Sequence, residues 1–285
     1  MDPEELTAVS EPVRAELPPA TRMGAVHLTV ADLDRSLAYY GTQIGLQVHA
    51  REGGRARLGT GGEDLLVLTE EPGAKPADGY SGLFHFALLV PERIDLARWL
   101  AHAARDRVAL TGLSDHFVSE ALYLRDPDHH GIEIYADRPR ELWEGQVGLR
   151  LTTEPLDTND LLATLDDPDS EPFDGLAGGT VMGHVHLCVA DVGRTVDYYR
   201  DVVGFGLMAQ LGDQAAFLSA GGYHHHLGGN TWQSAGRPYA PEGHARLTQM
   251  TIVLPDEASR DTLAERVGGR EVRDPSGIPI ALTTG

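Results

Sequence analysis

Two histidines and one glutamate stand at matching positions of a repeated sequence pattern, and these residue types can bind a metal ion. Counting back seven residues from Asp191 gives His184, and the same count from Glu92 gives His85. Glu133 lies in the last predicted strand of the unit that contains His85. Two imidazoles and one carboxylate form the facial ligand set of non-haem Fe(II), which leaves coordination positions open. We therefore predict a metal site formed by His85, Glu133 and His184.

The two remaining copies of the pattern lack metal ligands at these positions. The positions that match His85 and His184 hold Ala25 in the first copy and Gln249 in the fourth. The position that matches Glu133 in the fourth copy is Pro279, whose side chain has no donor atom. Because the second and third copies supply all three candidate ligands, we expect these two copies to pair around the metal.

The repeated unit predicts the element order βαβββ. In the first unit, about 24–71, an alternating strand at His27–Val30 precedes Asp32, which can cap a helix. Two further strands are predicted at Arg55–Leu58 and Asp64–Thr69. A single βαβββ unit cannot bury both faces of its sheet, so such units pair. The predicted fold class is α+β, with four βαβββ modules that form two curved mixed sheets. We call these units modules one to four; the last three span about 82–137, 183–232 and 245–283.

The modules divide the chain into two halves joined by a linker. Residues 1–22 are polar and contain proline, which predicts a disordered or extended arm. Residues 23–140 form the predicted N-terminal domain, with modules one and two. Residues 181–285 form the predicted C-terminal domain, with modules three and four. Residues 141–180 include a stretch rich in Asp, Glu and Pro, and they predict an acidic linker that is partly helical at Leu161–Leu165.

Composition excludes several classes of partner. The formal net charge of −20 repels phosphate backbones, so nucleic acid is not expected as a partner. No apolar run approaches the roughly 20 residues of a membrane span. The acidic start, Met1–Glu5, lacks the basic and apolar regions of a signal peptide, which favours a cytoplasmic location. The single cysteine, Cys188, cannot form an internal disulfide and is expected to be a buried thiol.

Further histidines and a tyrosine are expected near the predicted metal site. His224–His226 follow an apolar strand of module three, and we place them on that strand. Alternation along a strand would then point His225 away from the face of its two neighbours. Tyr123 lies ten residues before Glu133 and is expected on the adjacent strand, close to that carboxylate. His186 is interpreted as a packed or supporting histidine rather than a ligand.

With these motifs the chain resembles the vicinal oxygen chelate superfamily, and in particular the type I extradiol, catechol 2,3-dioxygenase-like proteins. The resemblance covers about 24–137 and 183–284. That family has βαβββ modules, a His–His–Glu iron site, an acid–base His in a His-His pair, and a Tyr ten residues before the ligand Glu. The resemblance implies that His225 is the acid–base residue and Tyr123 the hydrogen-bonding tyrosine. It also implies an active-site role for His116, seven residues before Tyr123.

The resemblance implies extradiol cleavage of a small catecholic substrate by O2, with Fe(II) or, as an alternative, Mn(II) in the site. The better-known extradiol enzymes take all three ligands from modules three and four, and this chain departs from that arrangement. A homo-oligomer is left open.

Two other functions stay open for this fold. One is a glyoxalase-type metal-dependent lyase or isomerase, and the other is a resistance protein that binds an aromatic antibiotic. A glyoxalase-type site needs a second carboxylate, but the matching position of module three falls near Leu227. Antibiotic-binding members usually lack metal ligands. Both considerations favour the dioxygenase.

Overall fold

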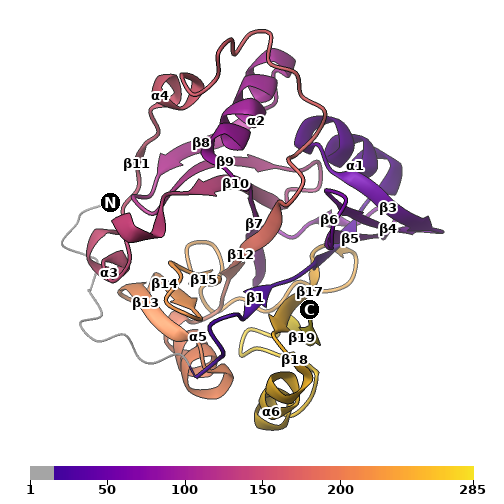
Figure 1. Ribbon diagram of the computed structural model, residues 1–285. Coiled ribbons are helices and arrows are strands. Elements are labelled where there is room, and N and C mark those ends of the chain that lie inside the picture. Colours follow the sequence, from indigo (N-terminus) through magenta and orange to yellow (C-terminus); the bar gives the residue numbers. More distant parts are fainter. Residues whose placement is uncertain (1–15) are drawn as a thin grey trace.

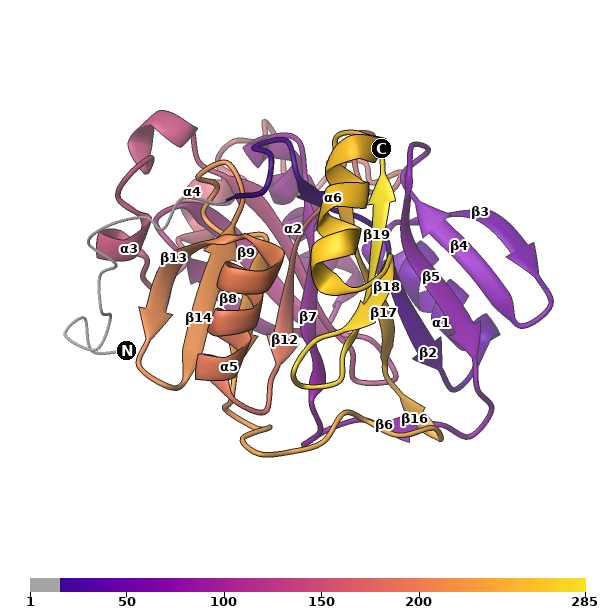
Figure 2. The ribbon, with the colours of Figure 1, turned by 90° about the horizontal axis from the view of Figure 1, so that it is seen from below.

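The computed structural model describes residues 16–285, and these fold into two mixed sheets that lie side by side (Figures 1 and 2). The first sheet combines modules two and three. Module two supplies β7 (Gly82–Leu89), α2 (Arg93–Asp106), β8 (Leu110–Asp115), β9 (Ser119–Arg125) and β10 (Gly131–Asp137). Module three supplies β12 (Val181–Cys188), α5 (Val192–Asp197), the π-helical turn η4 (Tyr198–Val203), β13 (Gly206–Leu211), β14 (Ala215–Ser219) and β15 (Leu227–Asn230).

The second sheet combines modules one and four. Module one supplies β2 (Val26–Val30), α1 (Leu33–Tyr39), the π-helical turn η2 (Tyr40–Ile44), β3 (Gln47–Glu52), β4 (Arg55–Gly59) and β5 (Asp64–Glu70). Module four is shorter and supplies β17 (Leu247–Leu254), α6 (Glu257–Val267), β18 (Glu271–Arg273) and β19 (Pro279–Thr284). Two short strands, β6 (Lys75–Pro76) and β16 (His244–Ala245), pair with each other outside both sheets.

Strand order shows how the modules meet. Over the described residues, the first sheet has the order β11-β8-β9-β10-β7-β12-β15-β14-β13, with the short β11 (Glu154–Pro155) at its edge. Modules two and three join where β7 pairs with β12. The second sheet has the order β18-β19-β17-β2-β5-β4-β3 and joins modules four and one in the same way, at β17 and β2. The predicted α+β class and the predicted pairing of modules two and three are confirmed. Each sheet thus combines one module from before residues 141–180 with one module from after them.

The acidic residue from which the ligand positions were counted caps the helix in every module. Asp32, Asp191 and Asp256 each accept a hydrogen bond from the backbone N–H three residues later. Glu92 forms a reciprocal capping box with Asp95 at the start of α2. Because the cap fixes where the strand ends and the helix begins, a constant count back from it reaches the same strand position in each module.

Helices cover the sheets on opposite sides of the molecule, with α1 and α2 on one side and α5 and α6 on the other (Figure 1). Hydrogen bonds that involve α2 and η2, the turn that continues α1, connect the two sheets. The indole N–H of Trp99, on α2, donates to the carbonyl of Ile44 in module one (3.1 Å). The Tyr40 hydroxyl donates to Asp126 of module two (2.9 Å). No helix within residues 16–285 is long and apolar enough to cross a membrane.

The predicted N-terminal arm is partly incorporated into the fold. Residues 1–15 lie outside the described residues. Leu17 is buried, and β1 (Arg22–Met23) pairs antiparallel with Ile252–Val253 of β17. Residues 16–22 are therefore not a loose arm, because Leu17 and Met23 bury apolar side chains in the core.

Residues 141–180 were predicted to be a linker, but this segment packs against the first sheet. It contains η3 (Arg140–Leu142), α3 (Val147–Arg150), β11 (Glu154–Pro155), which extends the first sheet beside β8, and α4 (Thr158–Leu162). Trp143 and Leu161 are almost fully buried. Its acidic residues form ion pairs with α2, including Arg93 with Asp160 (2.7 Å). Because the segment is rich in acidic residues, the sequence did not indicate that its few apolar residues are buried.

Candidate metal centre

Three neighbouring strands, β10, β7 and β12, bring the predicted ligands to one face of the first sheet. Ala87 of β7 lies opposite Glu133 of β10 on one side and opposite His184 of β12 on the other. His85 is two residues from Ala87 and therefore shares its face. The methyl group of Ala87 is small, so the three longer side chains can meet above it.

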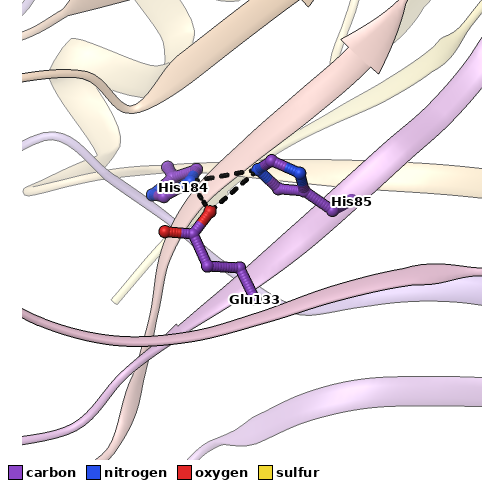
Figure 3. A group of neighbouring side chains, drawn as sticks. All are labelled: His85, Glu133 and His184. Atoms are coloured by element: carbon purple, nitrogen blue, oxygen red, sulfur yellow. Dashed lines mark hydrogen bonds and ion pairs between the residues drawn. The ribbon is translucent and has the colours of Figure 1, made fainter. Parts of the chain in front are cut away.

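The three predicted ligands converge (Figure 3). The Nε2 atoms of His85 and His184 each lie 3.0 Å from Oε2 of Glu133, and 3.3 Å separates the two nitrogens. All three side chains are buried. Two imidazole nitrogens and a carboxylate oxygen that face one another in this way form a donor set suited to a divalent metal such as Fe(II) or Mn(II).

Electrostatics favour the ligating forms of these residues. Burial on its own raises the pKa of the Glu133 carboxyl, but the contacts with His184 and His85 hold that pKa well below its ordinary range. Burial lowers the pKa of His184 despite the nearby carboxylate. An ionised Glu133 carboxylate and a neutral His184 imidazole are the forms in which these two residues can bind a metal.

Aromatic packing fixes the His184 ring. Its buried Nδ1 atom has no hydrogen-bond partner in the described part of the chain, so ring contacts add to the contact of Nε2 with Glu133 in setting the orientation of the ring. The centroid of Tyr135 lies 4.9 Å from that of His184. The Tyr135 hydroxyl occupies the space beside Gly183, where a Cβ atom would lie only 1.9 Å away. Gly183 therefore permits the close packing of Tyr135 against β12, next to the ligand.

A cavity of about 370 Å³ opens beside the three ligands. The three other predicted site residues, His116, Tyr123 and His225, all line it. The structure thus brings all six predicted site residues to one place.

His225 reaches the cavity from a connection between strands, not from a strand. His224–His226 were predicted to extend the preceding strand, but β14 ends at Ser219 and β15 begins at Leu227. Gly221 and Gly222 adopt positive φ angles, +60° and +69°, and turn the chain between them. The His225 ring lies 4.1 Å from the His184 ring, centroid to centroid. Burial, reinforced by nearby histidines, holds the pKa of His225 well below its ordinary range, so this imidazole is neutral.

Tyr123 and His116 form a hydrogen-bonded pair on the cavity wall. Tyr123 lies opposite Glu133 in the pairing of β9 with β10, as predicted. Its hydroxyl is 2.7 Å from Nε2 of His116, and Nδ1 of His116 is 2.7 Å from the carbonyl oxygen of Thr152. A carbonyl only accepts, so Nδ1 donates to Thr152 and Nε2 accepts from Tyr123. Burial, together with the Glu133 charge, raises the pKa of Tyr123 well above its ordinary value and keeps the phenol protonated.

His186 lines the cavity but is not one of the three candidate ligands. Asn230 contacts its Nε2 atom (3.0 Å), which agrees with the interpretation of His186 as a supporting residue. The pairing of β12 with β15 places Gly228, not Leu227, at the position of module three that matches Glu133. A Cβ atom at Gly228 would lie 2.7 Å from Nδ1 of His186. The His186 ring therefore fills the space in which a second carboxylate would stand.

Sequence patterns did not reveal several residues around the site. Thr152 comes from the segment predicted to be a linker, and Asp137 lies at the end of β10 without a motif of its own. Phe84, Phe217 and Trp232 line the cavity and pack around His186, with ring centroids 5.1, 5.6 and 5.9 Å from that of His186. Single aromatic residues in strands and turns are common, so only the packing between segments shows that these three belong together.

Comparisons of sequence show which proteins this chain is similar to. The model of a family described as the glyoxalase/bleomycin resistance protein/dioxygenase superfamily matches residues 22–134 and 181–248. The chain is 41% identical over 253 residues to a protein of Bacillus subtilis (strain 168) named catechol-2,3-dioxygenase, and the match covers 87% of each chain. The family match includes His85, Glu133 and His184.

Solved structures share the fold. A putative dioxygenase from Bacillus subtilis subsp. subtilis str. 168 superposes with a TM-score of 0.59 at 16% identity, over 92% of this chain and 85% of that one. Glyoxalase I from Zea mays superposes with a TM-score of 0.54 at 19% identity, over 92% of both chains. Because proteins named dioxygenase and glyoxalase share this fold, the choice between dioxygenase and glyoxalase chemistry depends on the residues of the site.

Proposed function

Because this chain belongs to the glyoxalase/bleomycin resistance protein/dioxygenase superfamily, we propose that it is an extradiol dioxygenase that cleaves a catechol-type aromatic ring with O2. The observation that supports this most directly is the buried His85–Glu133–His184 cluster on a cavity that His225 and Tyr123 also line. The catechol-2,3-dioxygenase name of the 41% identical relative supports the same chemistry.

The three ligands would hold Fe(II), or Mn(II), at one end of the cavity. When bound, the metal would bring the two catechol oxygens and O2 together and pass electrons between them. Both oxygen atoms would enter the product, a ring-opened semialdehyde. His85, Glu133 and His184 all approach from one sheet, which leaves the cavity side of the metal to substrates.

His225 would act as the acid–base residue. Its neutral imidazole can accept a proton from a catechol hydroxyl and return it later in the cycle. The Tyr123 oxygen, whose own proton is donated to His116, would accept a hydrogen bond from a substrate hydroxyl and orient the ring, and His116 would hold the Tyr123 hydroxyl in place. Each of these roles depends on a side chain that lines the cavity.

The position of Gly228 disfavours a glyoxalase-type reaction. Such a site needs a carboxylate from each of the paired modules, and module three offers glycine where module two offers Glu133. A binding protein without chemistry would have no use for three buried ligands that converge within 4.8 Å of one another.

Metal analysis and a colour assay test this proposal. We expect anaerobically purified protein to contain iron or manganese, and we expect a yellow ring-opened product after catechol and air are added. Zinc or nickel without colour would point instead to a lyase or isomerase. A metal-free protein that binds an aromatic drug tightly would point to a resistance protein.

The cavity is expected to favour uncharged catechols with apolar substituents. Phe84, Phe217 and Trp232 contribute apolar surface to its lining. Among the described residues that line it, Arg125 is the only arginine or lysine, and its guanidinium is already paired with Asp78 (3.3 Å). A substrate carboxylate would therefore be buried without a partner, which is costly. We predict that kcat/KM for 4-methylcatechol exceeds that for 3,4-dihydroxyphenylacetate by at least about tenfold, or ~1.4 kcal/mol. Equal values for the two substrates would contradict this prediction.

A further inference from the structure

A chain of hydrogen bonds links a carboxylate behind the cavity to His225. Asp137, at the end of β10, accepts from His224, whose Nε2 atom lies 2.9 Å from Oδ1 of Asp137. The Nδ1 atom of His224 lies 2.8 Å from the Nδ1 atom of His225. His224 has no exposed surface, and it packs against Tyr223, with 4.0 Å between the ring centroids. These contacts join β10 to the turn that carries the proposed acid–base residue.

The positions of the protons along this chain follow from its carboxylate end. A carboxylate only accepts, so Nε2 of His224 carries a proton and donates it to Asp137. We take His224 as a neutral imidazole, in which the other nitrogen is then an acceptor, so Nδ1 of His224 accepts. His225 must therefore donate through Nδ1, and its Nε2 atom has a free lone pair. Nε2 of His225 is thus the nitrogen that remains to accept a substrate proton, because Nδ1 is already engaged.

We propose that Asp137 and His224 are positioning residues that hold His225 in the tautomer whose Nε2 atom is unprotonated. This inference rests on the proposed function, because it assigns these residues a task only if His225 accepts a proton from substrate. The same hydrogen bonds would support His225 after it has accepted that proton, since the Nδ1–H group still donates to His224. A carboxylate that orients a catalytic imidazole through its second nitrogen is a general device of acid–base catalysis.

Removal of the carboxylate tests the proposal through turnover. We expect Asp137→Ala to lower kcat by about 10- to 100-fold, which is at most the lower end of the 10²–10⁴ that an acid–base residue itself contributes, because Asp137 acts only through His225. KM and metal content should stay near those of the unaltered protein, because Asp137 is not among the residues that line the cavity. Asp137→Asn, which conserves size, serves as a second variant if the alanine protein does not fold.

A double-substitution cycle separates positioning from a structural role. If Asp137 acts through His225, then Asp137→Ala should have little further effect on kcat in a protein that already carries His225→Ala. Equal losses in both backgrounds would overturn the proposal. Asp64→Asn is the matched control, since Asp64 pairs with His49 (2.8 Å) in the other sheet. That substitution should leave kcat unchanged.

The tautomer can also be measured without turnover. In protein loaded with diamagnetic Zn(II), ¹⁵N–¹H correlation spectra of the histidine rings should show His225 protonated at Nδ1 and unprotonated at Nε2. In Asp137→Ala we expect the Nε2-protonated tautomer to appear. An unchanged His225 tautomer would overturn the proposal. This readout is independent of the proposed function, whose own failure would appear as absence of ring cleavage by the unaltered, iron- or manganese-loaded protein.

Discussion

Replacement of Glu133 by glutamine is expected to leave a folded protein that binds almost no metal. The amide has nearly the same shape as the carboxylate, so packing among β10, β7 and β12 should persist. It lacks the negative charge, however, and two neutral imidazoles alone form a weak site. Loss of a residue that only orients a ligand costs roughly 10- to 100-fold in metal affinity or activity. We expect the loss of a ligand to cost more, measured as metal per folded monomer and as turnover.

Glu120→Gln provides the matched control for this substitution. Glu120 is also a buried glutamate on a strand of the first sheet, but it pairs with Arg93 (2.9 Å) and is not part of the ligand set. Its replacement should lower the thermal midpoint while metal per folded monomer stays the same. If Glu133→Gln bound metal as tightly as the unaltered protein, the ligand assignment would be wrong.

The candidate ligand cluster could be located from the sequence because local rules fix the positions of its residues. An acidic cap ends the first strand of each module, so a count of seven residues reaches His85 and His184 in equivalent places. The absence of ligands at Ala25, Gln249 and Pro279 then indicated that modules two and three pair. Both steps use only positions in the sequence and need no knowledge of contacts between distant segments. The pairing of β17 with β19 places Ala281, not the predicted Pro279, at the position that matches Glu133, and the alanine side chain has no ligand atom either.

The surroundings of the cluster depend on contacts between distant segments and could not be predicted in this way. Thr152 contacts His116 only because the segment 141–180 folds back over β8. His225 reaches the cavity from a turn formed by two glycines, so strand alternation gave the wrong local structure for it. Asp137 is an ordinary acidic residue in the sequence, and its link to the site exists only after β10 meets the turn that contains His224.

Replacement of His225 by alanine is expected to lower kcat by about 10²- to 10⁴-fold, the usual contribution of an acid–base residue. Metal content and KM for catechol should change little, because His225 is not one of the three ligands. Steady-state kinetics and metal analysis of the same preparation measure these quantities. His129→Asn is the control, since His129 is exposed in a turn with positive φ, a conformation that asparagine tolerates.

A comparison of substrates of different acidity shows whether the loss of kcat in His225→Ala reflects proton transfer. A catechol with an electron-withdrawing substituent, such as 4-nitrocatechol, releases its hydroxyl proton to water more readily and needs the neutral imidazole of His225 less. The ratio of kcat in the unaltered protein to kcat in His225→Ala should therefore be smaller for 4-nitrocatechol than for 4-methylcatechol. Equal ratios would mean that His225 contributes through packing against His184 (4.1 Å between ring centroids) and not as a base. A smaller ratio for the acidic substrate would place the proton transfer at His225, since substrate acidity can compensate only for a missing base.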